Sequence, residues 1–467
     1  MPNKVFIEPA REIPVIETDV LVAGAGTAGC VAAVAAARAG ARVVLVEKMP
    51  APSGTFTNGG NAFSSLYAQA RFDDDVRQIV RGLPEEILQR CVAYKGLEYY
   101  QYNDPHRAPI RARFNHEVVK GVLCEMLAEA GVKVLLQTFL CGAKTENGVI
   151  EAAIIENKDG RFAVEARQYI DCTGDGDLAK YCGAEQRPIW QHYNKMSGAA
   201  TSMPMSMCNI DLMKAATELP EVFRFFSGEK PHTDPDGTYH GGLFFLTVSK
   251  DTEGCEGLKS LGLREFCSFY STHPGHVYIN NSKGVQDDCS NAETLSNAEM
   301  TMRIKNVKMA KALIEEVPGF EHAYIDWQAM MLGIRASKVT VCDKMLTQEE
   351  ITAGTRFDDE VGLFGYNDYA TTHRHSELLI QSEDGVYGVP YRMILPVGIK
   401  NLYMAGRCVT EEPTAHMSTR NTVSCMVMGQ AAGVASALCA RQGCMSRELP
   451  YSTLRQALLS QDVVLDI

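Results

Sequence analysis

Residues 19–47 constrain the fold of this chain more than any other stretch, because they carry the whole pattern of a nucleotide-binding strand–helix–strand unit. A short apolar strand runs into Gly24, Gly26 and Gly29, an alanine-rich helix follows, and a second apolar strand ends at Glu47. A glycine-rich turn formed by chance would lack these flanking elements. The pattern therefore predicts an α/β protein with a Rossmann-like domain.

Each member of the pattern has a chemical reason. Gly24 permits a tight turn, Gly26 lets the backbone approach a pyrophosphate, and Gly29 lets the helix pack against the strand. The helix N-terminus presents unpaired N–H groups and a positive dipole end to the phosphates. Glu47 is placed to accept hydrogen bonds from the hydroxyls of an adenosine ribose, and its charge would repel a 2′-phosphate. The unit predicts a dinucleotide, and NADP is disfavoured.

Composition excludes several other classes of function. The chain has 467 residues, 46% of them hydrophobic, and a net charge of -12 at pH 7, which argues for a large core and against a nucleic-acid partner. Its 15 cysteines include no CxxC pair, so metal and iron–sulfur binding have no spacing support, and their odd number suits a reducing cytoplasm. The first residues show no signal-peptide pattern, and glycines and arginines interrupt the apolar stretch in 20–46. We expect a cytoplasmic protein without a membrane span.

The middle of the chain predicts a change of domain. Residues 115–131 carry apolar positions at helical spacing, and the alternating runs that follow predict a β-meander. Its last strand delivers the segment TGDGD, residues 173–177, to the edge of the sheet that holds the first glycine loop. Residues 190–330 hold both tryptophans and many Met and aromatic residues, and a long helix is expected over 291–316.

We expect a Rossmann-like cofactor-binding domain in two parts, residues 15–189 and 385–445. An α+β substrate domain, residues 190–384, is interleaved between them, and residues 446–467 form a C-terminal extension.

A second nucleotide-like segment near the C-terminus distinguishes between cofactors. NAD needs only the first unit and its neighbouring strands, whereas FAD is longer and its flavin end must be met by distant segments. Residues 401–433 supply a strand, a glycine turn and a helix rich in small residues. A helix beginning near residues 418–422 would direct its N-terminus at the flavin N1/C2 edge and stabilise the anion formed on reduction. Alternatively, the small residues serve only close helix packing; they are Ala431, Ala432, Gly433 and Ala435.

Five segments carry a family resemblance. In chain order they are GAGTAGCVAAVAAARAGARVVLVEK, FNHEVVKGVLCEML, YIDCTGDGDLAKYCGA, VPGFEHAYIDWQAMMLGIR and YGVPYRMILPVGIKNLYMAGRCVTEEPTAHMSTRNTVSCMVMGQAAG. They resemble the FAD-dependent oxidoreductase family related to the flavoprotein subunits of fumarate reductase and succinate dehydrogenase. The resemblance covers nearly the whole chain and implies FAD and redox chemistry, without specifying a substrate. The glycine pattern and the resemblance together imply these cofactor-binding residues: Gly24, Gly26, Thr27, Ala28, Gly29, Glu47, Lys48, Ser53, Gly54, Thr55, Asn58, Gly59, Gly60, Thr173, Gly174, Asp175, Gly406, Arg407, Gly429 and Ala432.

The chain departs from that family in three places. Members with covalent flavin have a His between Ser and Thr in the loop after the second strand, and Gly54 occupies that position here, so we expect non-covalent FAD. Arg407 replaces the acid of the Ala-Gly-Glu turn of the fumarate reductase branch. The arginine-rich stretch after Gly-Ile-Arg is reduced to residues 335–338, and the substrate-clamping pattern of fumarate reductases is not visible. The missing clamping pattern counts against a dicarboxylate substrate.

Four residues are candidates for catalysis. The resemblance implies Arg420, which matches an arginine that precedes the helix facing flavin and substrate; alternatively it pairs with a neighbouring acid at the helix entry. His416 is a candidate general base with a pKa near the working pH, or else a hydrogen-bonded loop histidine. His373 and His375 form an HxH pair that could relay a proton, and without an acid or Cys at ligand spacing we predict no metal site.

Three functions compete at this stage. The leading one is an FAD-dependent dehydrogenase that transfers a hydride from a small organic substrate to flavin N5 and passes electrons to an unknown acceptor. The alternatives are a flavin-dependent reductase of an activated double bond and an electron-transfer flavoprotein subunit of a complex. A second GxGxxG unit is absent, which argues against a built-in nicotinamide site. A homo-oligomer is left open.

Overall fold

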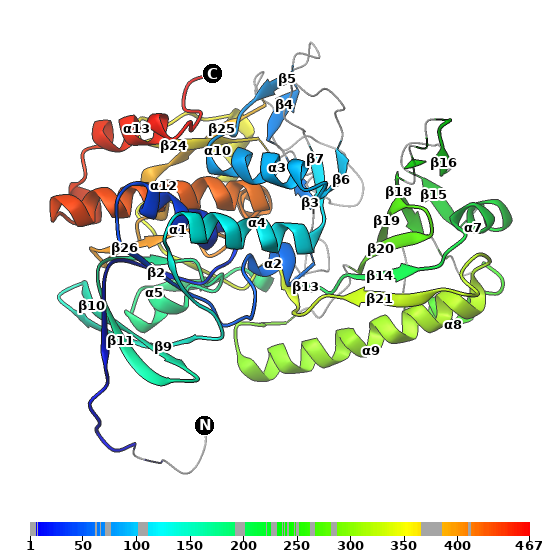
Figure 1. Cartoon of the computed structure of the whole chain (residues 1–467), viewed down its shortest axis with the longest axis horizontal. Coiled ribbons are helices and arrows are strands. Elements are labelled where there is room, and N and C mark those ends of the chain that lie inside the picture. Colours follow the sequence, from blue (N-terminus) through cyan, green and yellow to red (C-terminus); the bar gives the residue numbers. More distant parts are fainter. Residues whose placement is uncertain are drawn as a thin grey trace.

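The computed structural model of the chain has two parts, which Figure 1 shows side by side. The larger part surrounds helices α1 (Thr27–Arg38) and α12 (Thr422–Gln442), and the smaller part carries the long helix α9 (Ala292–Glu316). The structure describes residues 6–365 and 385–467, apart from positions 7, 61–62, 66, 71–75, 101–110, 192–200, 221, 226–230, 236, 238, 241, 247, 249–251, 262–266, 282–286 and 410–411.

A seven-stranded sheet forms the centre of the larger part, in the order β8-β2-β1-β11-β10-β9, with β26 also paired to β11. Neighbouring strands from β8 to β11, and the pair β11–β26, run parallel, whereas β9, β10 and β11 form an antiparallel meander. The end of β1, Val20 to Ala23, is fully buried, as expected for a parallel strand covered on both faces. The α/β class and the predicted meander are confirmed. The strands are β1 (Val15–Ala23), β2 (Val43–Val46), β8 (Lys133–Leu135), β9 (Phe139–Glu146), β10 (Val149–Asn157), β11 (Gly160–Asp171) and β26 (Leu402–Met404).

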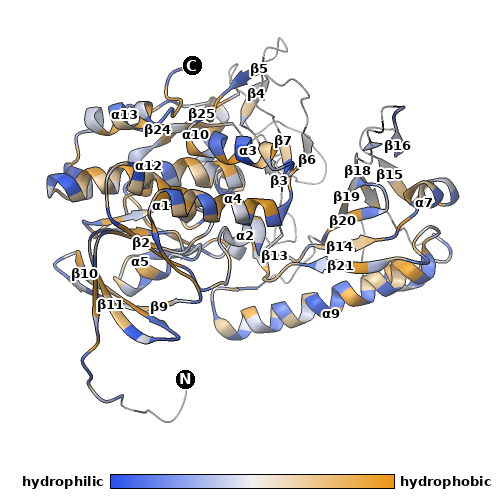
Figure 2. Cartoon of the chain, in the orientation of Figure 1, coloured by the Kyte–Doolittle hydropathy of each residue, from blue (hydrophilic) through white to orange (hydrophobic). Residues whose placement is uncertain are grey.

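Helices α1 and α12 pack closely against each other although they lie almost 400 positions apart in the sequence. A Cβ atom added at Gly429 would lie 2.3 Å from the carbonyl oxygen of Ala28, and one at Gly433 would lie 2.3 Å from that of Ala32. The small residues of α12 therefore do serve close helix packing. Helix α12 is long and apolar enough to cross a membrane by length and composition, but its apolar window is entirely buried in the fold, so it is a core helix. Figure 2 shows this pair largely in apolar colours, whereas α9 alternates between polar and apolar residues.

The smaller part is an antiparallel sheet with α9 beside it (Figure 1). Its strand order is β15-β18-β19-β20-β14-β21. Met205, Phe244 and Phe269 from the sheet share one apolar core with Met309 and Leu313 from α9. The predicted long helix is confirmed. The elements here are β14 (Met205–Cys208), α7 (Leu212–Glu218), β15 (Phe223–Phe225), β18 (Gly242–Leu246), α8 (Glu256–Ser260), β19 (Cys267–His273), β20 (His276–Asn281) and β21 (Tyr324–Gln328).

Shorter elements surround these two sheets. The helix expected within 115–131 is α4, where the Asn115 side chain accepts from the N–H groups of Glu117 and Val118. The domain boundaries predicted from the sequence stay predictions. The remaining helices and strands are α2 (Gly54–Thr57), β3 (Phe63–Ser65), β4 (Ala68–Ala70), β5 (Val76–Gln78), α3 (Leu83–Ala93), β6 (Leu97–Tyr100), β7 (Arg111–Phe114), α4 (His116–Glu129), α5 (Asp177–Tyr181), β12 (Gln186–Pro188), β13 (Thr201–Ser202), β16 (His232–Thr233), β17 (Tyr239–His240), β22 (Gly333–Ile334), β23 (Lys338–Thr340), α10 (Gln348–Ala353), β24 (Glu360–Phe364), β25 (Tyr387–Pro390), η1 (Tyr391–Ile394), α11 (Pro413–Thr419), η2 (Ser446–Glu448) and α13 (Tyr451–Ser460).

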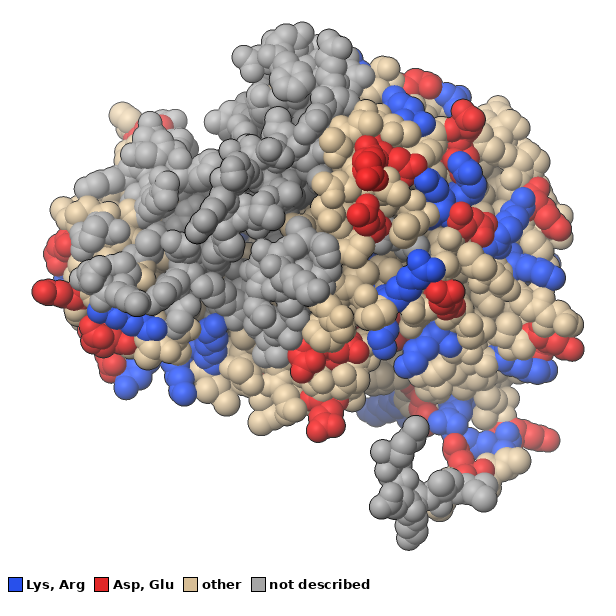
Figure 3. Space-filling model, turned by 180° about the vertical axis from the view of Figure 1, so that it is seen from behind, with Lys and Arg blue, Asp and Glu red and all other residues tan. Residues whose placement is uncertain are grey.

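The surface carries both signs of charge. Figure 3 shows acidic and basic side chains interspersed over the described part of one face, rather than gathered into a patch of one sign. Several of them are paired, as Arg90 is with Glu86, Glu125 and Glu129. Exposed pairs of this kind contribute little to stability.

Candidate active site

A cavity of about 460 Å³ lies at the carboxyl ends of the parallel strands. Gly24 follows β1, Glu47 follows β2, Cys172 follows β11, Ala405 follows β26, and all four residues line the cavity. Ligands of open α/β sheets bind at this edge. The sequence-predicted residues that line the cavity are Gly24, Gly26, Thr27, Ala28, Glu47, Lys48, Gly54, Thr55, Thr173, Gly174, Asp175, Gly406, Arg407 and Arg420.

The three glycines of the first loop have different surroundings. Gly24 has a φ of +90°, and a Cβ there would lie 2.6 Å from the Cys172 carbonyl oxygen. A Cβ at Gly29 would lie 1.8 Å from the Gly24 carbonyl oxygen, so this position is closed to any side chain. At Gly26 the nearest neighbour of an added Cβ is 3.6 Å away, although Gly26 lines the cavity. Gly24 and Gly29 are thus required by the fold, whereas a side chain at Gly26 would mainly occupy ligand space.

Glu47 is buried beside this loop. Its Oε2 accepts from the Ala25 N–H at 2.7 Å, and its Oε1 accepts from the Met49 N–H at 2.8 Å. Burial raises the pKa of this carboxyl, and the two backbone N–H groups act in the opposite direction. Each carboxylate oxygen accepts more than one hydrogen bond, so Glu47 holds the loop and still offers acceptors to a ribose.

The loop after β2 divides into two groups of residues. Gly54 and Thr55 line the cavity, and Ser53 before them has a φ of 80°, an unusual backbone conformation for a residue with a side chain. The other predicted residues of this loop, Ser53, Asn58, Gly59 and Gly60, are not among the cavity-lining residues. Asn58 Nδ2 instead donates to the Ala51 carbonyl oxygen at 2.8 Å, and the Gly60 carbonyl oxygen accepts from the Tyr278 hydroxyl.

Arg407 and Asp175 form an ion pair in the cavity wall. Arg407 Nη2 donates to Asp175 Oδ1 at 2.9 Å, and its Nη1 donates to the Gly174 carbonyl oxygen at 2.6 Å. The Ser337 hydroxyl donates to the same Asp175 oxygen. Fully buried Asp171 shapes the turn by accepting from the Thr173 hydroxyl at 2.7 Å, and burial raises the pKa of Asp171.

A second helix N-terminus, that of α12, also lines the cavity. Arg420, Asn421 and Thr422 line the wall where α12 begins, and neither α12 nor α1 has a side chain capping its first turn. Two uncapped helix N-termini therefore face one cavity, which favours an anionic ligand. Gly429 and Ala432 of α12 do not line it, because Gly429 packs against the backbone of Ala28.

The predicted histidines do not gather at the cavity. His416 is fully buried, its Nε2 lies 2.8 Å from the Arg407 carbonyl oxygen, and it does not line the cavity. Burial lowers the pKa of His416 to about 3, so the expectation of a pKa near the working pH is wrong. The alternative of a hydrogen-bonded histidine agrees with this geometry. His373 and His375 lie outside the described residues.

Sequence reasoning missed the contribution of the smaller part to the cavity. Leu295 and Glu299 from α9 line it, together with residues 330–332 and Arg335. Glu299 Oε1 accepts from the Leu332 N–H at 2.5 Å, which ties α9 to this loop. Nothing in the local sequence marks Glu299, because its role depends on the packing of a distant helix.

Asp177 is a further residue that the sequence did not single out as a ligand contact. It lines the cavity at the start of α5, and burial together with the Asp175 and Asp171 carboxylates raises the pKa of Asp177 to about 6. A carboxyl that titrates near neutrality inside a cavity is a functional-site signal.

Aromatic side chains from both parts of the protein pack together next to Gly60, at the end of the loop after β2. The His116 ring stacks on Trp327 with centroids 4.8 Å apart, and the Arg113 guanidinium lies 4.2 Å from the centroid of the Tyr278 ring. His116 Nε2 lies 3.1 Å from the Gly60 carbonyl oxygen, and burial lowers the pKa of His116 to about 3. The cluster fixes Gly60 between the parts.

The cavity fits the phosphate and ribose groups of a dinucleotide. The open side of Gly26, the two uncapped helix N-termini and the buried acceptor Glu47 supply the features that a pyrophosphate and a ribose require. Its volume is within the range of small-molecule sites.

Comparison with known proteins identifies a family. The family model described as FAD dependent oxidoreductase matches residues 19–458. No curated protein matches the sequence.

Solved structures give only weak likenesses. A geranylgeranyl bacteriochlorophyll reductase-like protein from Thermoplasma acidophilum is 13% identical with a TM-score of 0.43, over 96% of this chain and 87% of that one. The p-nitrophenol 4-monooxygenase from Pseudomonas putida DLL-E4 is 10% identical with a TM-score of 0.44, over 96% and 85% of the two chains. The anhydrotetracycline hydroxylase from Streptomyces rimosus is 14% identical with a TM-score of 0.42, over 96% and 66%. TM-scores this low do not define a common fold by themselves.

Proposed function

This chain belongs to the FAD-dependent oxidoreductase family, and from that premise we propose that it is a dehydrogenase of a small organic substrate. FAD is its cofactor, and we propose that it is held without a covalent bond because Gly54 occupies the attachment position. The electrons pass to an acceptor other than a nicotinamide held by this chain. The described cysteines form no disulfide bond with one another, in keeping with a proposed cytoplasmic location.

The proposal rests on one observation: both parts of the protein contribute residues to the wall of the cavity. One side consists of the dinucleotide-type loops around Gly24 and Gly174, and the other consists of Leu295, Glu299 and residues 330–332 from the smaller part. A substrate held by the second wall would therefore lie next to a cofactor held by the first. This arrangement supports chemistry on a substrate within the chain rather than electron carriage alone.

Arg420 is the residue we propose to bind and orient the substrate. It lines the cavity directly before α12, so its guanidinium and the first N–H groups of that helix act on one region. A fixed positive charge there would stabilise negative charge that develops during the reaction. FAD, when bound, supplies the hydride chemistry.

Removal of a proton from the substrate requires a group other than Arg420. His416 is buried and neutral, which removes it from direct proton transfer. His373 and His375 keep the proposed role of relay. Asp177 lines the cavity wall, and burial with the neighbouring carboxylates raises its pKa to about 6, so we propose it as a second candidate for proton transfer.

A reductase of an activated double bond is the second candidate. Arg335 and Arg420 both line the cavity, and two guanidinium groups suit a substrate that bears a carboxylate. This would agree with the proposed relation to fumarate reductase and succinate dehydrogenase flavoproteins, although Arg407 stands where the fumarate reductase branch has an acid.

Anaerobic flavin spectroscopy tests these functions. Purified holoprotein is mixed, without oxygen, with a panel of small hydroxy acids, amines and amino acids, and bleaching of the flavin absorbance is followed. We expect one donor class to bleach it at a saturable rate. Dithionite-reduced protein is then mixed with activated alkenes: reoxidation by an alkene, without bleaching by any donor, would replace the dehydrogenase with the reductase. Response to neither panel, with rapid reduction by dithionite, would favour the electron carrier.

A further inference from the structure

Three side chains of metal-binding type meet on the sheet of the smaller part. Cys208 ends β14, His276 begins β20, and Asp326 lies in β21. Strand β14 is hydrogen-bonded to both of the others, and Cys208 stands directly opposite His276 in the antiparallel register. None of the three residues lines the cavity described above. The cluster is therefore separate from the proposed active site.

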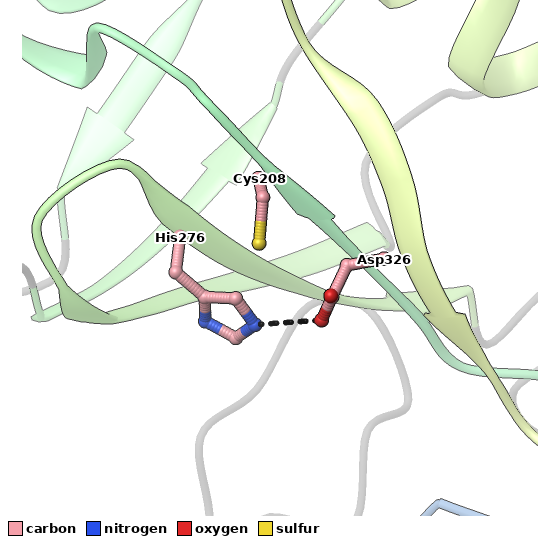
Figure 4. A group of neighbouring side chains, drawn as sticks. All are labelled: Cys208, His276 and Asp326. Carbon is pink, nitrogen blue, oxygen red and sulfur yellow. Dashed lines mark ion pairs between the residues drawn. The ribbon is translucent and has the colours of Figure 1, made fainter.

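The ligand atoms of this cluster face one another. His276 Nε2 lies 3.7 Å from Asp326 Oδ2, and the sulfur, nitrogen and oxygen atoms all lie within 4.8 Å of one another. Figure 4 shows the sulfur and the carboxylate on the same side of the imidazole as Nε2. The Ser206 hydroxyl donates to Asp326 Oδ2 at 3.1 Å, which orients the carboxylate from outside the cluster.

We propose that Cys208, His276 and Asp326 bind one Zn²⁺ ion, with a water molecule as the fourth ligand. Thiolate, imidazole and carboxylate are the three side-chain ligands that Zn²⁺ takes, whereas Ca²⁺ and Mg²⁺ prefer oxygen alone. Tetrahedral bonds of about 2.0–2.3 Å separate neighbouring ligand atoms by roughly 3.3–3.8 Å. The His276–Asp326 distance already has this value, and side-chain rotation of Cys208 closes the remainder.

Charge supports a cation at this position. Among the described residues, His276 is the only ion-pair partner of Asp326, so no lysine or arginine occupies the place of the metal. Two anionic ligands, a thiolate and a carboxylate, would offset the double charge of Zn²⁺. A thiol–imidazole–carboxylate relay is the competing interpretation, but it uses the two ring nitrogens for two different partners, whereas one edge of the His276 ring faces both groups here.

The thiol proton provides a readout that is specific to the metal. A cysteine thiol is mostly protonated at neutral pH, whereas Zn²⁺ binds only the thiolate. Zn²⁺ binds the thiolate and displaces that proton to the solvent. Binding is therefore expected to release one proton per ion and to weaken as the pH falls.

Calorimetric titration tests the site in the FAD-loaded protein. After dialysis against a chelator, ZnCl₂ is titrated in two buffers of different ionisation enthalpy, which gives stoichiometry, affinity and protons released. We expect one ion per chain and about one proton. Cys208→Ala, His276→Ala and Asp326→Asn should each weaken binding by about a hundredfold or more, since even partners outside the ligand shell are worth 10–100-fold. His322→Ala removes an exposed histidine on the same part and should bind Zn²⁺ as the wild type does.

Two measurements keep the test decisive if a variant is unstable. FAD content shows whether each variant is folded, and Asp326→Asn is the mildest change in shape. Co²⁺ replaces Zn²⁺ as a spectroscopic probe, and its ligand-field bands beyond the flavin absorption should be present in the wild type and absent in Cys208→Ala. If the wild type binds no more Zn²⁺ than Cys208→Ala does, the proposal is overturned.

Discussion

Arg407 reaches from the turn after β26 to Asp175 in the turn after β11, where its Nη2 donates to the carboxylate at 2.9 Å. The two side chains are only 15% and 14% exposed. Arg407 thus holds two turns of the cavity wall together. Its guanidinium also satisfies the Gly174 and Ile334 carbonyl oxygens, so one side chain joins three segments.

Loss of this ion pair should destabilise the protein. Arg407→Ala leaves the Asp175 carboxylate without its ion-pair partner, and we expect the free energy of unfolding to fall by about 2–3 kcal/mol. Urea denaturation followed by far-UV circular dichroism measures the change. Arg392→Ala is the matched control, because Arg392 pairs with Asp359 but is 54% exposed, and its loss should cost under about 1 kcal/mol. Equal effects of the two changes would show that Arg407 does not hold the two turns together.

Glu47→Ala should weaken FAD binding by about one to two orders of magnitude, because it removes one charge-assisted hydrogen bond to a ribose hydroxyl. Part of the loss will come from the loop, because Ala25 and Met49 lose their acceptor. Fluorescence of FAD released on dilution gives the dissociation constant. If occupancy on dilution matches that of the wild type, Glu47 does not contact the cofactor.

Gly26, at the start of α1, and Gly429, in α12, separate the effect of lost ligand space from the effect of disturbed helix packing. Gly26→Ala adds a methyl group with no neighbour closer than 3.6 Å, so the unfolding midpoint without FAD should hardly change while FAD affinity falls at least about tenfold. Gly429→Ala places its methyl 2.3 Å from the Ala28 carbonyl oxygen and should lower stability by about 1–3 kcal/mol. Thermal unfolding with and without FAD distinguishes these effects. A loss of stability in Gly26→Ala without FAD, or unchanged stability in Gly429→Ala, would contradict these roles of the two glycines.

FAD binding should depend on pH through Asp177. Its pKa is raised to about 6, so the carboxyl is neutral at pH 5 and negative at pH 7.5, where it repels an anionic cofactor. Affinity should fall up to about tenfold across this range, about 1.4 kcal/mol. Its pKa is raised above the unfolded value, so its contribution to stability also declines between about pH 4 and 6 as the pH rises. Asp177→Asn should remove both dependences; a variant whose FAD affinity still follows the wild-type pH profile would exclude Asp177.

Arg420→Ala should leave FAD bound and slow substrate-driven flavin reduction by about a hundredfold or more, the effect of removing a preorganised electrostatic donor. Arg420→Lys should restore only part of the rate, because it keeps the charge without the planar fork. Stopped-flow bleaching with substrate gives the rates, and dithionite is the control that bypasses the substrate. Equal substrate-driven rates in Arg420→Ala and wild type would remove Arg420 from the reaction.

The sequence predicted the parts of this molecule that depend on local pattern. The positions of Gly24, Gly26 and Glu47 were predictable because strand, turn and helix signals are contiguous there, and the meander and the two long helices followed from periodicity. The burial of His416 was not predictable, since a loop histidine and a core histidine look alike in one sequence. Glu299 was missed because only the packing of α9 in the folded protein brings it to the cavity.

The close contact between α1 and α12 has a consequence for the synthesis of the protein. The first loop of the cofactor site is synthesised almost 400 residues before the wall that carries Arg420 and before the helix that covers α1. Contacts between segments so distant in the sequence form slowly and late. A nascent chain therefore exposes the apolar face of α1 until α12 emerges. Truncation before residue 420 removes one wall of the cofactor site and the cover of the core, and such fragments are expected to depend on chaperones.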